Sequence, residues 1–166
     1  MGASATGIAA IAGRAEPGLG QRRATMARSH WLVKSEPSTY AWDDLVRDGR
    51  TRWDGVRNPL ARQHLGSMRR GDLVLYYHSG QGKDVVGIAR VAREAYADPT
   101  APDGRWLAVD LEPVRPLVAP VVLAAIKADR KLAGLALVRQ PRLSVMPVAA
   151  EQFAHILALG RTRSPR

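Results

Sequence analysis

Two apolar segments joined by a short loop place the strongest constraint on what this chain can fold into. Residues 73–77 read Leu-Val-Leu-Tyr-Tyr and residues 85–91 read Val-Val-Gly-Ile-Ala-Arg-Val, with the glycine-rich loop Ser79–Lys83 between them. Short apolar runs rich in branched and aromatic side chains are typical of strands, and a loop of this length connects the strands of a hairpin. We therefore predict an apolar β-hairpin. Gly87, inside its second strand, predicts a bulge or a close approach to the backbone.

The other segments predict further short strands and short helices. Asn58 followed by Pro59 is a typical helix start, because the Asn side chain caps free amides and Pro fits the first turn. Short strands with helices at the margins favour an α+β fold, a small and partly open mixed β-barrel with flanking short helices, over a β-α-β sheet. The remaining predicted strands are 31–33, 106–111 and 143–145, and the predicted helices are 42–47, stopped at Gly49, then 58–71, stopped at Gly71, then 121–129 and 149–159.

The ends of the chain differ in composition from its body. Residues 1–25 are rich in Gly and Ala without a strong period, and Met26 stands directly before the first strand pattern, so we predict that 1–25 is a disordered extension or that Met26 is the native start. Residues 161–166 are predicted to be a basic tail, which leaves 26–160 as one domain. No run of 18 apolar residues is present, so we predict no transmembrane helix.

The charge balance favours an acidic partner. The formal net charge is +10, and most of the basic residues are Arg, whose planar guanidinium suits phosphate and base-edge recognition. A chain whose Arg codons are simply common would have the same composition, so charge alone is a weak argument for nucleic acid.

The sequence lacks the usual signatures of enzymes and metal sites. There is no cysteine, which excludes disulfides and thiolate zinc sites and favours a reducing compartment. The four histidines are not spaced as a metal pair, and no phosphate loop, dinucleotide fingerprint or nucleophile elbow is present. Gly80–Lys83 resembles a phosphate loop, but a strand follows it, so a hairpin turn is the better interpretation. We therefore expect no enzymatic activity, no metal and no cofactor.

Three segments carry more polar and aromatic groups than a core requires. Trp31–Pro37 ends a strand with Lys, Ser and Glu, Trp53–Arg62 brings a Trp, an Arg and an Asn to a helix start, and Tyr76–Ser79 is aromatic and polar at a strand end. A base-binding pocket needs this mixture, because aromatic faces stack on the ring while hydroxyl, amide and backbone groups read its edge.

Each of these residues also has a purely structural interpretation. Trp31 fits a core position, Asn58 fits a helix cap, and His78 fits a satisfied strand-end histidine. Arg57 and Arg62 fit a solvated face. Taken singly, the structural interpretation is the stronger one in nearly every case.

Seven motifs in a fixed order make the sequence similar to a known family. They are Trp31–Pro37, Trp53–Arg62, Gly71–Ser79, Val86–Ala89, Ala95–Thr100, Trp106–Asp110 and Arg142–Val148. In this order they resemble the EVE domain family of the PUA-like superfamily, and the resemblance runs from Trp31 to about Leu159. The resemblance implies a PUA-like barrel, related to YTH domains, that reads modified bases, chiefly modified cytosines such as 5-methylcytosine in DNA, and modified RNA bases.

The resemblance also implies a set of site residues, carried over motif by motif. The base pocket would be formed by Ser35, Trp53, Asn58, Tyr76, His78 and Ser79, with Trp31 as a further aromatic candidate. Backbone or rim contacts would come from Lys34, Arg57, Arg62 and Arg142, and weaker candidates are Asp98 and Ser144.

Departures from the family pattern leave the base preference open. Pro59 and Leu60 replace the Tyr and Gln of many members, Gln63 stands where a second Asn is frequent, and the loop 98–105 is short. These features suggest a compact, bacterial-type member, for which we expect a cytoplasmic monomer that binds nucleic acid. Two alternatives remain: an adaptor that binds a protein or small metabolite through the same pocket, and a base-processing hydrolase using His78, Ser79 and Asp98.

Overall fold

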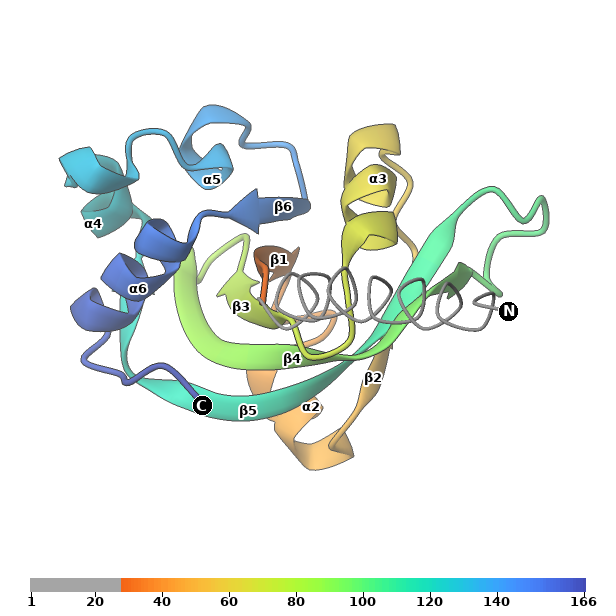
Figure 1. Cartoon of the computed structure of the whole chain (residues 1–166), viewed down its shortest axis with the longest axis horizontal. Coiled ribbons are helices and arrows are strands. Elements are labelled where there is room, and N and C mark those ends of the chain that lie inside the picture. Colours follow the sequence, from red (N-terminus) through yellow and green to blue (C-terminus); the bar gives the residue numbers. More distant parts are fainter. Residues whose placement is uncertain (1–27) are drawn as a thin grey trace, which may run out of the picture.

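The computed structural model describes residues 28–166, so the predictions for residues 1–25 and for Met26 lie outside the described residues. Six strands form one mixed sheet in the order β2-β5-β4-β3-β1-β6. The strands are β1 (His30–Ser35), β2 (Thr51–Trp53), β3 (Leu73–His78), β4 (Asp84–Ala97), β5 (Leu107–Val122) and β6 (Val145–Val148). Figure 1 shows β4 and β5 as two long, strongly curved strands that bend around β1 and β3.

The predicted hairpin is confirmed as β3 and β4, which pair antiparallel. β1 pairs parallel with β3, and α2, β2 and α3 lie between them in the chain, so the fold does contain one crossover of the β-α-β kind that the sequence interpretation had set aside. β6 pairs antiparallel with the other side of β1, and β2 pairs antiparallel with β5.

The sheet is not closed into a barrel, which corrects the sequence prediction. In the part of the chain that the structure describes, the edge strands β2 and β6 each pair with one neighbour and not with each other. Both edges are short, and Pro147 in β6 has no amide hydrogen to donate to a further strand. Helix α3 also packs against β6.

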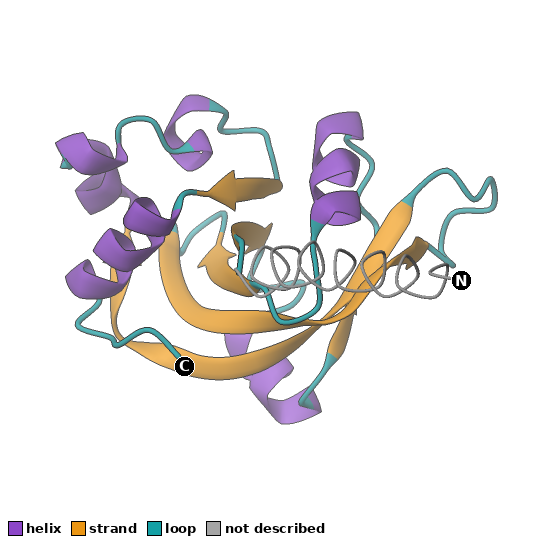
Figure 2. Cartoon of the chain, viewed as in Figure 1, coloured by secondary structure: helices purple, strands orange, loops and turns teal. Residues whose placement is uncertain are grey.

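Five short α-helices accompany the sheet within residues 28–166 (Figure 2). They are α2 (Trp42–Asp48), α3 (Pro59–Ser67), α4 (Leu123–Ala128), α5 (Ala136–Arg139) and α6 (Ala150–Leu159), with the 3-10 turn η2 (Arg130–Leu132) after α4. Helices α2, α3 and α6 begin within one residue of their predicted positions. None of these helices is long and apolar enough to cross a membrane.

Several boundaries differ from the prediction for local reasons. Helix α3 ends at Ser67 and not at Gly71, because Met68 already has an extended backbone. β4 and β5 are longer than predicted, because polar residues interrupt the apolar pattern from which strands are predicted. β5 includes two residues that were expected in α4. The last strand lies at 145–148 and not at 143–145, and β2, α5 and η2 were not predicted at all. Residues 161–166 form no helix or strand, although Thr162 accepts a hydrogen bond from the Val118 amide.

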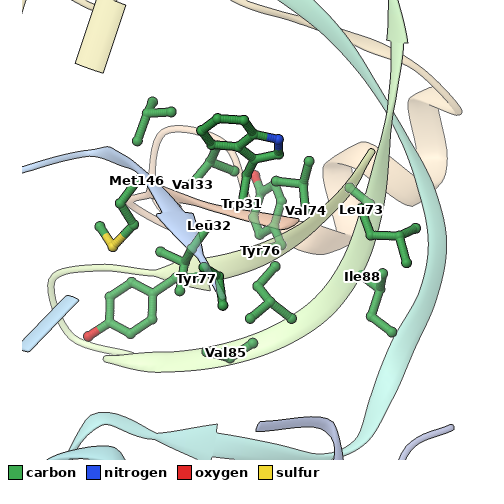
Figure 3. Close-up of a cluster of buried hydrophobic side chains, with 14 of the residues drawn as sticks. Trp31, Leu32, Val33, Leu73, Val74, Tyr76, Tyr77, Val85, Ile88 and Met146 are labelled. Atoms are coloured by element: carbon green, nitrogen blue, oxygen red, sulfur yellow. The ribbon is translucent and has the colours of Figure 1, made fainter. Parts of the chain in front are cut away.

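The apolar core contains buried side chains from every strand and every α-helix of residues 28–166, and Trp42 of α2 packs into it directly over Gly87 of β4. A Cβ on Gly87 would come within 2.7 Å of the Trp42 ring, which confirms the predicted close approach, and the β4 register shifts beside it. Trp42 meets Tyr76 edge-on with ring centres 5.5 Å apart, and Trp53 of β2 also meets Tyr76 edge-on at the same distance. Figure 3 shows part of this core, with labelled side chains including Trp31, Leu32, Val33, Leu73, Tyr76, Val85 and Ile88.

Candidate functional site

A pocket of about 590 Å³ opens between the end of β1 and the strand β2 with the loop that follows it. These two strands are not neighbours, because β5, β4 and β3 stand between them in the sheet order. The curvature of the sheet brings them together. The lining residues are Lys34, Ser35, Thr39, Tyr40, Thr51, Arg52, Trp53, Asp54, Gly55, Val56, Arg57 and Ser144.

The wall from β1 is organised around the backbone carbonyl of Tyr40. The Ser35 hydroxyl donates to this carbonyl at 2.8 Å, and the Tyr76 hydroxyl donates to it at 2.7 Å. Tyr76 is fully buried, and this burial raises its pKa well above the ordinary range, so the hydroxyl remains a donor. Tyr76 therefore supports the pocket from behind, whereas Ser35 and Tyr40 line it.

Lys34 adds a cation to the same wall. Its ammonium donates to the Pro141 carbonyl at 2.8 Å and lies 6.0 Å from the centre of the Tyr77 ring. Partial burial lowers the pKa of Lys34. One of its three N–H groups is occupied by Pro141, which leaves donors for an acceptor in the pocket.

The opposite wall is held by a buried carboxylate, Asp98, which is only 1% exposed. Asp98 accepts hydrogen bonds from the Gly55 amide at 2.9 Å, from Arg57 Nη1 at 2.9 Å, and from both the amide and the hydroxyl of Thr100 at 2.7 Å. Burial alone raises the pKa of Asp98, but the hydrogen bonds from Thr100, Arg57 and Gly55 outweigh it and hold the pKa far below its usual range. Asp98 thus fixes the backbone and one guanidinium of this wall.

An arginine–tryptophan cluster continues from this wall to the surface. The Arg57 guanidinium donates to the Thr100 hydroxyl at 3.0 Å and lies 5.8 Å from the Trp106 ring centre. The Arg62 guanidinium lies 5.3 Å from the same ring and donates to the Arg105 carbonyl at 3.3 Å. The cluster gathers two cations around Trp106, and of its three members only Arg57 lines the pocket.

The structure brings five of the predicted site residues together in the pocket lining. Of the proposed base-pocket set, Ser35 and Trp53 line it, and of the rim and weaker sets, Lys34, Arg57 and Ser144 line it. Trp53 is 9% exposed, so most of its ring is committed to the core and one part faces the pocket.

The other predicted residues lie outside the lining, and most of them have structural partners. Trp31 is a core residue whose indole N–H donates to Asp72 Oδ2 at 2.9 Å. Asn58 caps α3 by accepting from the Ala61 amide at 2.9 Å, and His78 Nε2 accepts from the Trp42 amide at 3.0 Å. The Ser79 amide donates to the Ser35 carbonyl, and Arg142 is exposed beside Pro141.

The residues of the imagined hydrolase triad are not connected. Among residues 28–166, no hydrogen bond joins His78, Ser79 and Asp98, and the partners of Asp98 are Gly55, Arg57 and Thr100. Over the same range, no three His, Asp or Glu side chains gather in a way that could hold a metal ion.

Five polar lining side chains were not selected from the sequence: Thr39, Tyr40, Thr51, Arg52 and Asp54. Asp54 belongs to the Trp53–Arg62 motif, and a systematic inclusion of every polar residue in that motif would have found it. Tyr40, Thr51 and Arg52 lie outside the polar motifs, and only the packing of α2 and β2 brings them to the pocket.

Comparison with known proteins identifies relatives over most of the described chain. The family model described as the EVE domain matches residues 29–159. Human thymocyte nuclear protein 1 is 30% identical over 165 residues, which cover 79% of this chain and 73% of that protein.

Solved structures have the same fold. A protein of Rhodopseudomonas palustris, known by NMR, is 49% identical with a TM-score of 0.77, and the match covers 80% of this chain and 93% of that one. The human THYN1 protein, solved in complex with DNA containing 5-methylcytosine, is 29% identical with a TM-score of 0.75, covering 82% and 99%. A YTH domain of Zygosaccharomyces rouxii, solved in complex with N6-methyladenosine RNA, shares the fold at 16% identity and a TM-score of 0.55, covering 84% and 90%. With the family model matched from residue 29 to residue 159, this chain belongs to the EVE domain family.

Proposed function

We propose that this protein is a non-catalytic reader of nucleic acid, which receives a modified base, such as a modified cytosine in DNA or a modified RNA base, in the pocket between β1 and β2. The observation that carries this proposal is the composition of the pocket: the rings of Tyr40 and Trp53 stand beside the hydroxyls of Ser35, Thr39 and Thr51. Its volume of about 590 Å³ lies within the range of ordinary ligand pockets.

The solved complex of the human relative supports the class of ligand. That protein was solved with DNA containing 5-methylcytosine, and its 29% identity extends over 82% of this chain. This chain has the same fold, and its pocket is lined by aromatic and polar groups. Such a pocket suits a base that has been flipped out of the stack.

The charges around the pocket support binding to a phosphate backbone. Lys34, Arg52 and Arg57 line the pocket, against one carboxylate, Asp54. Arg62 adds a further cation outside the lining, over the same Trp106 ring that Arg57 approaches. Phosphate contacts from such groups contribute to affinity through counterion release, so binding should weaken as salt rises. Unstacking a base costs a few kcal/mol, and aromatic stacking returns about 1–3 kcal/mol, so phosphate contacts are needed for a useful affinity.

Binding without catalysis is the proposal because the candidate catalytic groups already serve the fold. His78 accepts from a backbone amide, and Asp98 is occupied by Gly55, Arg57 and Thr100. An adaptor that binds a protein or a metabolite through this pocket is the competing possibility.

The test is a binding panel with the full chain. Short DNA and RNA oligonucleotides would carry cytosine, 5-methylcytosine, 5-hydroxymethylcytosine or N6-methyladenine, each at two salt concentrations. We expect salt-dependent binding with a clear preference for one modified base. Equal, weak binding to all members that vanishes with salt, or binding to a nucleoside-free partner without salt dependence, would contradict the proposal.

Two lysine variants separate the pocket from general charge. Lys34→Gln removes a cation that lines the pocket, and Lys127→Gln removes an exposed cation of α4 that does not. We expect Lys34→Gln to weaken binding of the preferred base by more than Lys127→Gln does. Equal effects of the two variants would indicate that the pocket is not used.

A further inference from the structure

We propose that Asp54 reads the exocyclic amino group of the bound base, so that the pocket accepts a cytosine-type base and rejects thymine and uracil. This inference deepens the proposed function and rests on it: it names the base class and the residue that selects it.

Asp54 differs from the other side chains of the pocket in charge and in what it can accept. It is the one acidic residue among the lining residues of the described pocket, and its side chain is 33% exposed. Arg52 Nε donates to Asp54 Oδ2 at 2.8 Å. Within residues 28–166, no group donates a hydrogen bond to the second oxygen, Oδ1. One oxygen of this lining residue is therefore held by Arg52, and the other is available as an acceptor.

The backbone beside Asp54 is fixed, which a specificity-determining residue requires. Gly55 has a φ of 76°, in the left-handed region that favours glycine, and its amide donates to the buried Asp98. On the other side, Trp53 is paired in β2 and packed edge-on against Tyr76. Asp54 thus lies between two residues whose positions are fixed by hydrogen bonds and packing.

The chemistry of the four pyrimidines explains why a carboxylate would discriminate among them. Cytosine and 5-methylcytosine carry an amino group at C4, which donates hydrogen bonds, whereas uracil and thymine carry a carbonyl there, which only accepts. At the C4 position an ionised carboxylate accepts from the amino group but repels the carbonyl, and a bound base that leaves this polar contact unpaired loses affinity. The opposite wall offers donors from Lys34, which suit the remaining carbonyl of the base.

The structural alternative is a plain surface ion pair between Arg52 and Asp54. Such exposed pairs contribute little to stability, and this one uses a single carboxylate oxygen. An ion pair that served stability alone could lie anywhere on the surface, and it would not explain why an acidic residue lines the pocket. The position of Asp54 in the pocket, together with its unengaged oxygen, favours recognition.

The experiment compares four target bases that differ in two groups. Cytosine, 5-methylcytosine, uracil and thymine would each be placed once in a duplex opposite an abasic site, so that no target is base-paired and opening costs are matched. The 5-methylcytosine and thymine duplexes share the methyl group and differ in the C4 substituent and in the proton on N3, and the cytosine and 5-methylcytosine duplexes differ in the methyl group alone. Binding of the full chain is measured for the unmodified protein, for Asp54→Asn and for Asp43→Asn. Asp43 is an exposed residue of α2 outside the pocket lining, so Asp43→Asn matches the loss of charge.

We expect the unmodified protein and Asp43→Asn to bind 5-methylcytosine over thymine by at least about fivefold, the lower end of what one good base contact supplies. In Asp54→Asn the ratio should fall to about one or invert, because an amide can donate to the thymine carbonyl. A ratio unchanged by Asp54→Asn, or no preference over thymine in the unmodified protein, would overturn the inference. Failure of the proposed function is a different result: the panel of modified and unmodified oligonucleotides would then show equal, weak binding to all members, whatever the ratio of 5-methylcytosine to thymine.

Discussion

Asp98 Oδ2 lies 2.9 Å from Arg57 Nη1, and the same buried oxygen accepts from the Gly55 amide at 2.9 Å. One carboxylate from the loop after β4 therefore holds both the backbone and a cation of the pocket wall that follows β2. These segments are more than forty residues apart in the chain. The pair links the stability of the fold to the shape of the pocket.

Replacing Asp98 should damage both properties. Asp98→Asn keeps the shape of the side chain but removes its charge and part of its accepting capacity, so we expect a loss of about 2–3 kcal/mol in the free energy of unfolding and weaker nucleic-acid binding. The measurement is urea unfolding together with the binding panel. Asp103→Asn in the same loop is the control, because Asp103 accepts only from the nearby Arg105 amide among its described contacts, and its effect should stay within about 0.5 kcal/mol.

The low pKa of Asp98 predicts a loss of stability in acid. The folded pKa lies below the ordinary value of 3.8, so the charged form stabilises the fold at every pH above that value, and the contribution is lost as the pH falls below 3.8 toward the folded pKa. Urea unfolding at pH 7, 5, 4 and 3 should show the decline between pH 4 and pH 3. The decline should be shallower in Asp98→Asn, and parallel curves for the two proteins would assign the acid sensitivity to other carboxyls.

Gly87 should not tolerate a side chain. An added Cβ would lie 2.7 Å from the Trp42 ring, so Gly87→Ala must displace that ring or the strand, and we expect a destabilisation of about 1–3 kcal/mol. Gly134→Ala is the matched control, because the nearest atom to its added Cβ is 4.0 Å away. Thermal unfolding of the two variants provides the comparison, and equal midpoints would show that the Trp42 contact is easily relieved.

Variants of Asn58 test whether this residue acts as a helix cap or as a contact to the base. Because Asn58 Oδ1 accepts from the Ala61 amide, Asn58→Ala should cost about 1 kcal/mol in stability, and Asn58→Asp, which keeps the accepting oxygen, should restore most of it. We expect the base preference to survive both changes. It is measured at a temperature well below the unfolding midpoint of each variant, so that the protein is folded. A loss of preference in Asn58→Asp, despite normal stability, would return Asn58 to the pocket.

Local signals predicted much of the secondary structure but less of the site. The start of α3 at Asn58–Pro59 and the β3–β4 hairpin are determined by residues that are close together in the sequence. Both were therefore predicted correctly. The strand β2, of only three residues, has no local pattern of its own, because its pairing with β5 is what makes it a strand. Tyr40 was missed for a similar reason, since its carbonyl becomes a pocket element only through donors from Ser35 and Tyr76.

The sequence by itself determined the element types, the family to which the ordered motifs belong, and the polar and aromatic character of the segments that meet at the pocket. The tertiary structure decided which of those residues face the pocket and which support it. Trp31, Asn58 and His78 look as suitable as Ser35 and Trp53 in the sequence, yet each is engaged by Asp72, Ala61 or Trp42. The physical reason is that a side chain's role depends on the partner that satisfies it, and the partners come from segments far away in the chain. The curved sheet, which brings β1 and β2 together across three intervening strands, is what selects them.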